Sequence, residues 1–446
     1  MKVEQVVFQS GERFPMLLNE ERCPDFWSTL FVSRRLRQQT QSSINSFLRS
    51  ISLLYKWQKI HKRNLVVEFE KEKVPSLFEV ESLKEYCGLK SEYIQKELEG
   101  KSLGKMTKMS SFSLGKGSPL AKVGNDLQQR RMHDISEFLA FVGREIVKRR
   151  NKATSLLTEI ESMLKLFKAH YPKSNYSNGN QRLPHAEKEA FVKFMEVTNV
   201  NHRDNPFKGY DNQLRNYLLI QVIYWTGARS GEVLSLNLDS IDYDVESPTL
   251  TILRTHDDPY DTRKYQPLTK TKSREVPIPS SLRDDLDYYI NKVRSKFLKA
   301  KTHPYIFVSH KGPTAGSPMT NSTFYNRVIQ TAKAINPEMF KLVKRHGFRH
   351  LFNELFSERV DLHNQKMRED MLLAEQNGEF EKVAILKKQV ITEQQEMDAR
   401  ATLMGWENTD SARPYIKRYI QKATRKLHKE MMQEMSKVQR EVKNKR

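Results

Sequence analysis

Apolar residues recur at three- and four-residue steps over much of the first 170 residues, which is the pattern of helices with one buried face. The first such stretch begins near Thr40, and its apolar positions are Ile44, Phe47, Leu48, Ile51, Leu54 and Tyr55. Further helices are expected at residues 77–89, 134–149 and 153–171. Residues 1–33 lack this period and predict a short extended lead-in. The pattern therefore predicts a small helical domain over residues 34–170.

Two segments interrupt the helical pattern. Residues 101–125 contain four glycines, a proline and five lysines, a composition that predicts a basic loop. The GKGS run inside this loop is not a phosphate-binding P-loop, because it lacks both the first glycine and the final Ser or Thr of that motif. Residues 171–183 are rich in Pro, Asn, Ser and Gly and predict a linker between two domains.

The pattern from residue 184 onward predicts a second domain, 184–446, that is helical with a small β segment. Helices are expected at 186–200 and 212–225. Residues 249–254 (TLTILR) resemble a strand, and strands at 266–270 and 274–279 are expected to flank a turn at 270–273. The expected fold class is therefore mainly α with a small β-sheet, an α+β architecture.

Two further helical segments lie near the end of the chain. Residues 361–403 are polar and interrupted by Asn377-Gly378, so they predict a helical hairpin that projects from the domain. Its second half keeps a nearly seven-residue repeat at Phe380, Val383, Val390 and Met397. The hairpin is either a protein-contact element or a tolerated surface insertion. Residues 415–446 carry a net charge of +8 and predict a basic amphipathic helix, which can pack on its own domain, on a neighbouring subunit or along DNA.

Charge and composition narrow the class of protein. The chain of 446 residues has 76 Lys and Arg against 54 Asp and Glu, a net charge of +22, which favours a polyanionic partner and nucleic acid first. Its two cysteines exclude a disulfide framework and a cysteine-based zinc site. No apolar run reaches the roughly 18 residues of a membrane span, and the N-terminus lacks the apolar core of a signal peptide. We therefore expect an intracellular protein without a membrane partner.

Two short stretches of the second domain carry basic residues at positions suited to phosphate. In Thr226–Glu232 (TGARSGE), Arg229 is expected at the start of a helix, beside backbone amides that also favour phosphate. In Lys270–Arg274 (KTKSR), a lysine at a predicted hairpin tip can reach into a groove. Taken alone, the first is an ordinary surface arginine and the second an ordinary solvated turn.

Two later stretches add histidine, arginine and tyrosine. In His346–His350 (HGFRH), His346 and Arg349 are three residues apart and share a helix face. The two histidines suit a zinc pair by spacing, but the glutamate of HExxH is absent and no third ligand is evident, so no metal is expected. Leu403–Trp406 (LMGW) is followed nine residues after its tryptophan by Tyr415, which alone would be a packing tyrosine.

Together these residue types suit one reaction. Two arginines can clamp a phosphate with planar donors and stay charged at any working pH. A lysine or histidine can protonate a leaving alkoxide, and a tyrosine can attack phosphorus and hold it covalently. The sequence shows no cluster of carboxylates that would indicate a Mg²⁺ site. The set therefore predicts metal-free phosphoryl transfer on a DNA backbone, without a cofactor.

In order and spacing, these stretches resemble the tyrosine recombinases, the phage integrase family. The family's T-G-x-R-x-x-E box matches 226–232, and its H-x-x-R-H box matches 346–350. Its Leu-x-Gly-(His/Trp) box, followed by the nucleophile, matches 403–406 and Tyr415. The resemblance covers about 184–430, and the upstream helical domain is similar to the family's core-binding domain in type and place.

The resemblance implies a role for each matched residue. Arg229 and Arg349 would bind the non-bridging oxygens of the scissile phosphate and stabilise the pentavalent transition state. Tyr415 would be the nucleophile, which gives a 3′-phosphotyrosyl link and a free 5′-hydroxyl. His346 would assist proton transfer. Trp406 stands where many members have histidine, and its indole N–H can donate a hydrogen bond but cannot shuttle a proton.

Other residues are implied as supports or alternatives. Glu232 would orient Arg229 or the neighbouring backbone, and His350 is a second supporting residue. The lysine that protonates the leaving 5′-oxygen maps to Lys270, with Lys272 as the alternative because the length of this turn varies in the family. Tyr419, one helical turn beyond the expected nucleophile, is an alternative nucleophile that breaks the spacing. The chain departs from the family in its long stretch between the second arginine and the tryptophan.

The resemblance implies a site-specific DNA recombinase that integrates or excises a mobile element without metal or ATP. Its partner would be double-stranded DNA gripped by both domains, with a homotetramer on two DNA sites, a dimer on each, and possible accessory proteins. The expected location is the cytoplasm, at the nucleoid. The alternatives are a resolvase, a transposase-type recombinase, a telomere resolvase, a type IB topoisomerase and an inactive DNA-binding protein on the same fold.

Overall fold

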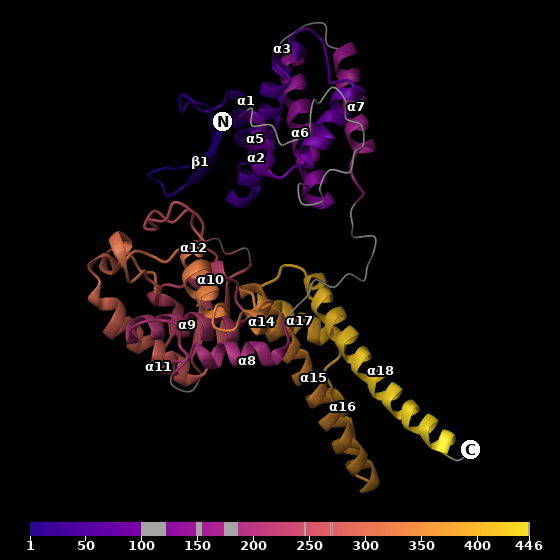
Figure 1. The fold of residues 1–446 in the computed structure, drawn as a ribbon. Helices are drawn as coiled ribbons and strands as arrows, with labels where there is room; N and C mark the ends of the chain where they lie inside the picture. Colours follow the sequence, from indigo (N-terminus) through magenta and orange to yellow (C-terminus); the bar gives the residue numbers. More distant parts are fainter. Residues whose placement is uncertain are drawn as a thin grey trace. The chain divides into compact units, whose positions relative to one another are not determined.

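The computed structural model describes residues 1–99, 122–148, 154–173, 186–244, 247–267, 269 and 271–444 (Figure 1). The chain forms two compact units, residues 1–9 with 13–182 and residues 10–12 with 183–446. Most of the predicted basic loop, with its GKGS run, and residues 174–183 of the predicted linker lie outside the described ranges. The predicted fold class is confirmed, because the described chain is mainly helical with two small antiparallel sheets.

The first unit begins with a β hairpin. Strands β1 (Lys2–Val7) and β2 (Arg13–Leu18) pair antiparallel, and helix α1 (Phe26–Phe31) follows. Leu17 is fully buried, and Phe31 packs flat on Phe47 with a ring-centroid distance of 4.6 Å. The residues expected as an extended lead-in are therefore part of the hydrophobic core of this unit.

Helices make up the rest of the first unit. Thr40 caps the longest of the early helices, since its hydroxyl accepts a hydrogen bond from the backbone N–H of Ser43. The buried faces of α2 and α6 meet in the core, as the apolar period predicts. The helices after α1 are a π-helical turn at Val32–Leu36, α2 (Gln41–Ile60), α3 (Leu65–Glu70), α4 (Leu77–Cys87), α5 (Ser91–Leu98), α6 (Asn125–Lys148) and α7 (Thr154–Ala169).

The second unit surrounds a hydrophobic core with helices and a three-stranded sheet. Its first helices are α8 (Lys188–Val197), α9 (Tyr210–Thr226) and α10 (Ser230–Leu234). Strands β3 (Ile241–Asp242), β4 (Thr249–Ile252) and β5 (Arg274–Pro277) follow. The remaining helices are α11 (Ser280–Tyr288), α12 (Asn321–Thr323), α13 (Gln330–Lys333), α14 (Pro337–Phe340), α15 (Arg345–Gln376), α16 (Phe380–Gln389), α17 (Glu393–Met404) and α18 (Arg413–Asn444), with short 3-10 and π-helical turns between them. Among the described residues, no helix has both the length and the apolar character that crossing a bilayer requires.

The sheet differs from the one predicted. Strand β4 pairs directly with β5, with Leu250 opposite Val276, so the loop between them runs from 253 to 273. The strand predicted at 266–270 is wrong, because residues 266, 267 and 269 form no strand. The loop instead carries buried polar contacts of its own, including an ion pair of 2.8 Å between Arg263 and Asp261. Residues 271–273 therefore end this loop and do not form the tip of a tight hairpin.

Helices α15 and α16 lie side by side and project from the second unit (Figure 1). The chain turns between them at Gly378, whose φ of +73° is a conformation that suits glycine. The predicted seven-residue repeat does not form a buried seam, because α16 has no buried residue and Phe380 is 74% exposed. Two helices cannot enclose a core alone, so the apolar residues near the hairpin tip stay at the surface.

A partly buried histidine, His310, makes the stability of the second unit sensitive to acid. The His310 ring stacks on Phe297 and Tyr289, at centroid distances of 4.9 and 6.0 Å, and hydrogen bonds to the Tyr289 hydroxyl at 3.2 Å. Burial, and then the positive charges of Arg215 and Lys296, lower the pKa of His310 to about 3. The folded protein therefore holds this imidazole neutral.

The free energy of unfolding is expected to fall as the pH drops from 7 to 5. The unfolded chain binds a proton at His310 near pH 6.5 and the folded chain only near pH 3, so the unfolded state takes up more protons between these values. This histidine is expected to account for up to about 2 kcal/mol of the loss at pH 5. Denaturant unfolding at both pH values measures it. His310→Gln should flatten the pH dependence, whereas the same change at the exposed His428 on α18 should not; equal slopes in all three proteins would contradict the expectation.

Candidate active site

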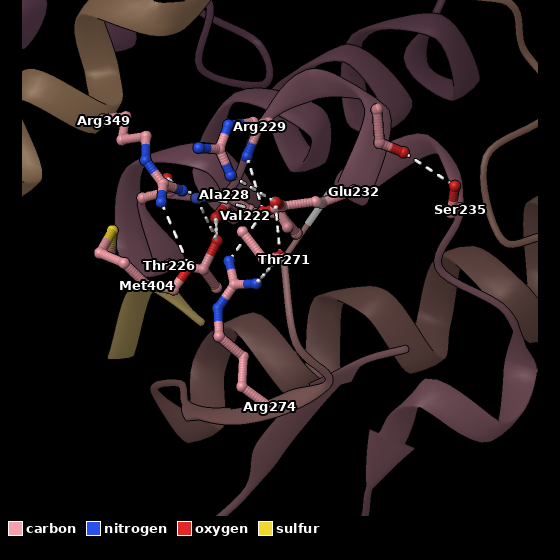
Figure 2. Close-up of polar contacts among 12 residues, drawn as sticks. Val222, Thr226, Ala228, Arg229, Glu232, Ser235, Thr271, Arg274, Arg349 and Met404 are labelled. Atoms are coloured by element: carbon pink, nitrogen blue, oxygen red, sulfur yellow. Dashed lines mark hydrogen bonds and ion pairs between the residues drawn. The ribbon is translucent and has the colours of Figure 1, made fainter. Parts of the chain in front are cut away.

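A fully buried carboxylate, that of Glu232, lies at the centre of a polar cluster in the second unit (Figure 2). Helix α9 ends at Gly227, whose φ of +59° turns the chain so that α10 can begin directly after Arg229. The backbone N–H of Arg229 donates to Glu232 Oε2 at 3.0 Å, and its Nη1 donates to Oε1 at 3.1 Å. Glu232 thus closes the start of α10 and contacts the Arg229 side chain.

The end of the loop before β5 and the first residue of β5 supply two more donors to the same carboxylate. Arg274 Nη2 donates to Glu232 Oε2 at 2.7 Å, and Thr271 Oγ1 donates to Oε1 at 3.0 Å (Figure 2). Arg274 Nη1 also donates to Thr271 Oγ1 at 2.9 Å. The sequence analysis assigned no role to Arg274. Its signal is the inward-facing position that it shares with Val276 on β5, where a charged residue is rarely found without a partner.

The guanidinium of Arg349 lies on the other side of Glu232. It is fully buried in the first turns of α15, and its Nη1 lies 3.9 Å from Glu232 Oε2. Nη1 donates to the carbonyl of Gly227 at 3.0 Å, and Nη2 donates to the carbonyl of Met404 at 3.3 Å. Burial, and then the charge of Arg229, lower the pKa of Arg349 to about 10, so the side chain is still charged at neutral pH.

Four rings form a contiguous row beside the arginines. The ring centroids of His346 and His350 are 4.8 Å apart, those of His350 and Tyr415 are 5.0 Å apart, and those of Tyr415 and Trp406 are 5.2 Å apart. Tyr415 therefore lies between an imidazole and an indole, and the guanidinium of Arg349 lies 5.3 Å from the Trp406 ring. Partial burial, and then the charges of Arg349 and Arg229, lower the pKa of His346. A neutral His346 can accept a proton.

The candidate general acids and the alternative nucleophile are described only in part. Lys270 and the side chain of Tyr419 lie outside the described residues. Lys272 is exposed, and its backbone N–H donates to the carbonyl of Gly405 at 2.9 Å. A Cβ at Gly405, where φ is +63°, would lie 2.7 Å from the Lys272 carbonyl oxygen. The backbone of Lys272 therefore packs directly on the turn that precedes Trp406.

A second buried arginine, Arg400, joins α17 to α15. It donates to the Asn353 carbonyl at 2.8 Å and to Ser357 Oγ at 2.7 Å, and it also contacts Glu396. The side chain of Asn353 in turn donates to the carbonyl of Arg349 at 2.7 Å. These hydrogen bonds fix the position of α17 on α15, and with it the position of the turn that precedes Trp406. Sequence reasoning missed Arg400, since α17 is polar on most faces and its sequence shows no apolar period.

The structure thus brings most of the sequence-predicted residues into one cluster, built from four segments of the second unit and the loop before β5. These residues are Arg229, Glu232, His346, Arg349, His350, Trp406 and Tyr415. Within the described part of the chain, no three His, Cys, Asp or Glu side chains gather in the manner of metal ligands. Two arginines, a tyrosine hydroxyl and imidazoles in this arrangement can bind a phosphate, attack it and move a proton.

Residues 182–366 match the model of the phage integrase family. The similarity to this family therefore lies within residues 182–366 of the 446-residue chain. The match includes Arg229, Glu232, His346 and Arg349 and ends inside α15. Trp406 and Tyr415 lie beyond it, after the α15–α16 hairpin, so their assignment rests on the motif spacing and on the ring contacts.

Two tyrosine recombinases are similar to part of this chain. Tyrosine recombinase XerD of Halalkalibacterium halodurans is 27% identical over 172 residues, which are 38% of this chain and 50% of that protein. Tyrosine recombinase XerC-like of Caldanaerobacter subterraneus subsp. tengcongensis is 33% identical over 156 residues, 32% of this chain and 39% of that protein. The chain therefore spans half or less of the length of the relatives it matches.

Solved structures of recombinases align over a larger share of the chain. The crystal structure of XerA recombinase aligns with 87% of this chain and 92% of its own, with a TM-score of 0.32 and 12% identity. The Tn1549 transposon integrase in complex with circular intermediate DNA aligns with 87% of this chain and 93% of its own, with a TM-score of 0.42 and 12% identity.

Proposed function

We propose that this protein is a site-specific DNA recombinase that cuts and rejoins DNA strands through a covalent bond to Tyr415, for the integration or excision of a mobile element. The observation that carries the proposal is the position of Tyr415, which stacks on Trp406 and packs at a tilt against His350 in the same cluster as Arg349 and Arg229. A packing tyrosine would have no need of two arginines and two histidines around it.

In the proposed reaction, the Tyr415 hydroxyl oxygen attacks the phosphorus of a DNA phosphodiester, and the bond from phosphorus to the 5′-oxygen breaks. The products are a 3′-phosphotyrosyl bond and a free 5′-hydroxyl. The tyrosine proton passes to a neighbouring base, for which the imidazoles of His350 and His346 are placed, and the leaving oxygen takes a proton from a lysine of the 270–272 segment. Rejoining is the reverse attack by a 5′-hydroxyl, so the phosphotyrosine conserves the bond energy and no ATP is consumed.

Arg229 and Arg349 stabilise the transition state in this proposal. Two guanidiniums offer paired donors to the non-bridging oxygens, where negative charge accumulates during the attack. Arg349 is held by two carbonyl groups, so its orientation does not depend on the substrate. The indole N–H of Trp406 supplies one further donor.

The partner in this proposal is double-stranded DNA, which the net charge of +22 favours. We further propose a dimer on each DNA site and a homotetramer on two sites, located at the nucleoid in the cytoplasm. Helix α18 supports the assembly, because Leu427, Met431 and Met435 are 66%, 47% and 59% exposed along it and would be covered in a contact between subunits. Accessory proteins are compatible with the exposed α15–α16 hairpin.

The proposal is tested with nicked duplexes that carry the DNA flanking the gene, in the presence of EDTA. Cleavage of the nicked strand a few nucleotides from the nick releases a short 5′-hydroxyl fragment that diffuses away and prevents rejoining, so the covalent intermediate accumulates. A protein–DNA band that survives a denaturing gel is expected, and peptide mass mapping should place the nucleotide on Tyr415. DNA binding without a covalent band would favour the inactive DNA-binding protein. A band that requires Mg²⁺ would contradict the metal-free mechanism.

A further inference from the structure

Among the arginines around Glu232, Arg274 is the one that the reaction leaves without a role. Both Nη atoms of Arg274 are engaged inside the cluster, one with the Glu232 carboxylate at 2.7 Å and one with Thr271. The Nη atoms of Arg349 bind two neutral carbonyl groups instead, and Nη1 lies 3.9 Å from the carboxylate. Arg274 is therefore the arginine whose charge the carboxylate takes up directly.

Glu232 competes with the substrate for the arginines. It is a fully buried anion within 3.1 Å of Arg229 Nη1 and 3.9 Å of Arg349 Nη1. A buried carboxylate draws in any neighbouring cation unless another cation satisfies it. Burial alone would raise the pKa of Glu232, but the charge and hydrogen bond of Arg274, and then the charge of Arg349, keep this pKa below its ordinary value. Among the charges around Glu232, that of Arg274 has the largest effect.

We propose that Arg274 is a positioning residue for DNA cleavage, which by pairing with Glu232 leaves Arg229 and Arg349 available to the scissile phosphate. The inference rests on the proposed function. The 2.7 Å ion pair occupies Oε2, the oxygen that faces Arg349. Without Arg274, this oxygen would attract Arg349 Nη1 and tighten the hold on Arg229, so both guanidiniums would turn toward the carboxylate.

The ion pair between Arg274 and Glu232 also fixes the position of Thr271 and Lys272. Arg274 and Thr271 both bind Glu232, and the Lys272 backbone between them donates to the Gly405 carbonyl. One carboxylate thus connects the start of α10, the loop before β5 and, through Gly405, the turn that leads to Trp406. Loss of Arg274 is therefore expected to affect the alignment of the reacting groups and not the grip on DNA.

The test compares wild type with Arg274→Met, Arg274→Lys and the double variant Arg274→Met/Glu232→Gln. Single-turnover cleavage of the nicked duplex is measured at saturating protein, at a temperature where each variant is folded, together with DNA affinity. We expect Arg274→Met to cleave about 100-fold more slowly, in the range for loss of a preorganised donor, with little change in DNA affinity. The double variant should recover about tenfold, because it removes the competing charge as well.

Arg263→Met is the matched control. It breaks an ion pair of 2.8 Å that is buried to the same degree in the same unit, between Arg263 and Asp261. A residue that serves the fold alone should lower the melting temperature and leave the cleavage rate of the folded protein unchanged. If Arg274→Met shows this behaviour too, the inference is overturned. Should Arg274→Met fail to fold, Arg274→Lys takes its place, with an expected loss of about tenfold because one donor replaces two; a wild-type rate would overturn the inference.

Calorimetric titration of the DNA-free protein with inorganic vanadate separates the two proposals. Vanadate mimics a pentavalent phosphate, and its affinity should fall in Arg274→Met and recover in the double variant, in parallel with cleavage. If wild type cleaves DNA and binds vanadate but Arg274→Met equals it in both, the proposed function stands and the inference fails. If wild type neither cleaves nor binds vanadate, the proposed function fails, and the inference with it.

Discussion

Replacing Tyr415 with phenylalanine is expected to abolish the covalent protein–DNA complex and leave DNA binding intact. Phenylalanine keeps the ring that stacks between His350 and Trp406, so the cluster should keep its packing. It removes only the hydroxyl oxygen that attacks phosphorus. Because no covalent intermediate can form without this atom, the expected loss is at least about 1,000-fold, to below detection on a denaturing gel. An electrophoretic mobility shift measures the retained binding.

Tyr419→Phe is the matched control for this experiment. It removes a hydroxyl one helical turn further along α18, and its covalent band should equal that of wild type. A band that persists in Tyr415→Phe and disappears in Tyr419→Phe would identify Tyr419 as the nucleophile. A band that survives both changes would mean that another side chain attacks the DNA.

Replacing Arg349 with lysine is expected to slow cleavage by at least about 100-fold. The guanidinium binds the carbonyls of Gly227 and Met404 through two different nitrogens, and a lysine has one nitrogen to replace them. Burial that lowers the pKa of the arginine to about 10 would also favour the neutral form of a lysine at that place. The variant should therefore lose both the orientation and part of the charge that face the phosphate. Single-turnover cleavage at saturating protein measures the loss.

Arg215→Lys is the matched control, since Arg215 is a buried arginine of the same unit that binds Asn216 and the Val308 carbonyl. Its thermal stability should fall as much as that of Arg349→Lys, while its cleavage rate should stay near that of wild type. Equal cleavage rates in the two lysine variants would show that the loss comes from destabilisation and would contradict a role of Arg349 at the phosphate.

The α15–α16 hairpin explains why the catalytic motifs are so far apart in the sequence. The two helices leave the second unit after the Arg349 turn and return through α17, where Arg400 and Asn353 join α17 to α15. These buried hydrogen bonds hold α17 against α15, so the residues at the end of α17 lie close to Arg349. Trp406 can therefore contact Arg349 although Met404, which precedes it, lies 55 positions after Arg349 along the chain.

Many helices and most candidate site residues of this protein could be predicted from its sequence, because both follow from local physical chemistry. Helices such as α2 and α6 bury one apolar face, so their apolar residues recur every three to four positions. This period is visible in the sequence without knowledge of any tertiary contact. The candidate site residues could be predicted because arginines, histidines and a tyrosine together suit metal-free phosphoryl transfer. Helical spacing also places His346 and Arg349 on one face. The family domain followed from these spacings and is confirmed by the match over residues 182–366.

Only the tertiary structure decided which residues share a partner. The pairing of β4 with β5 across the loop from 253 to 273, and the convergence of Arg274, Arg229 and Arg349 on Glu232, join residues up to 117 positions apart along the chain. The alternation along β5 marks Arg274 as inward-facing but does not identify its partner, because that partner lies far away in the sequence. The cost of burying a charge depends on what surrounds it in space, and that is determined only when the whole chain has packed.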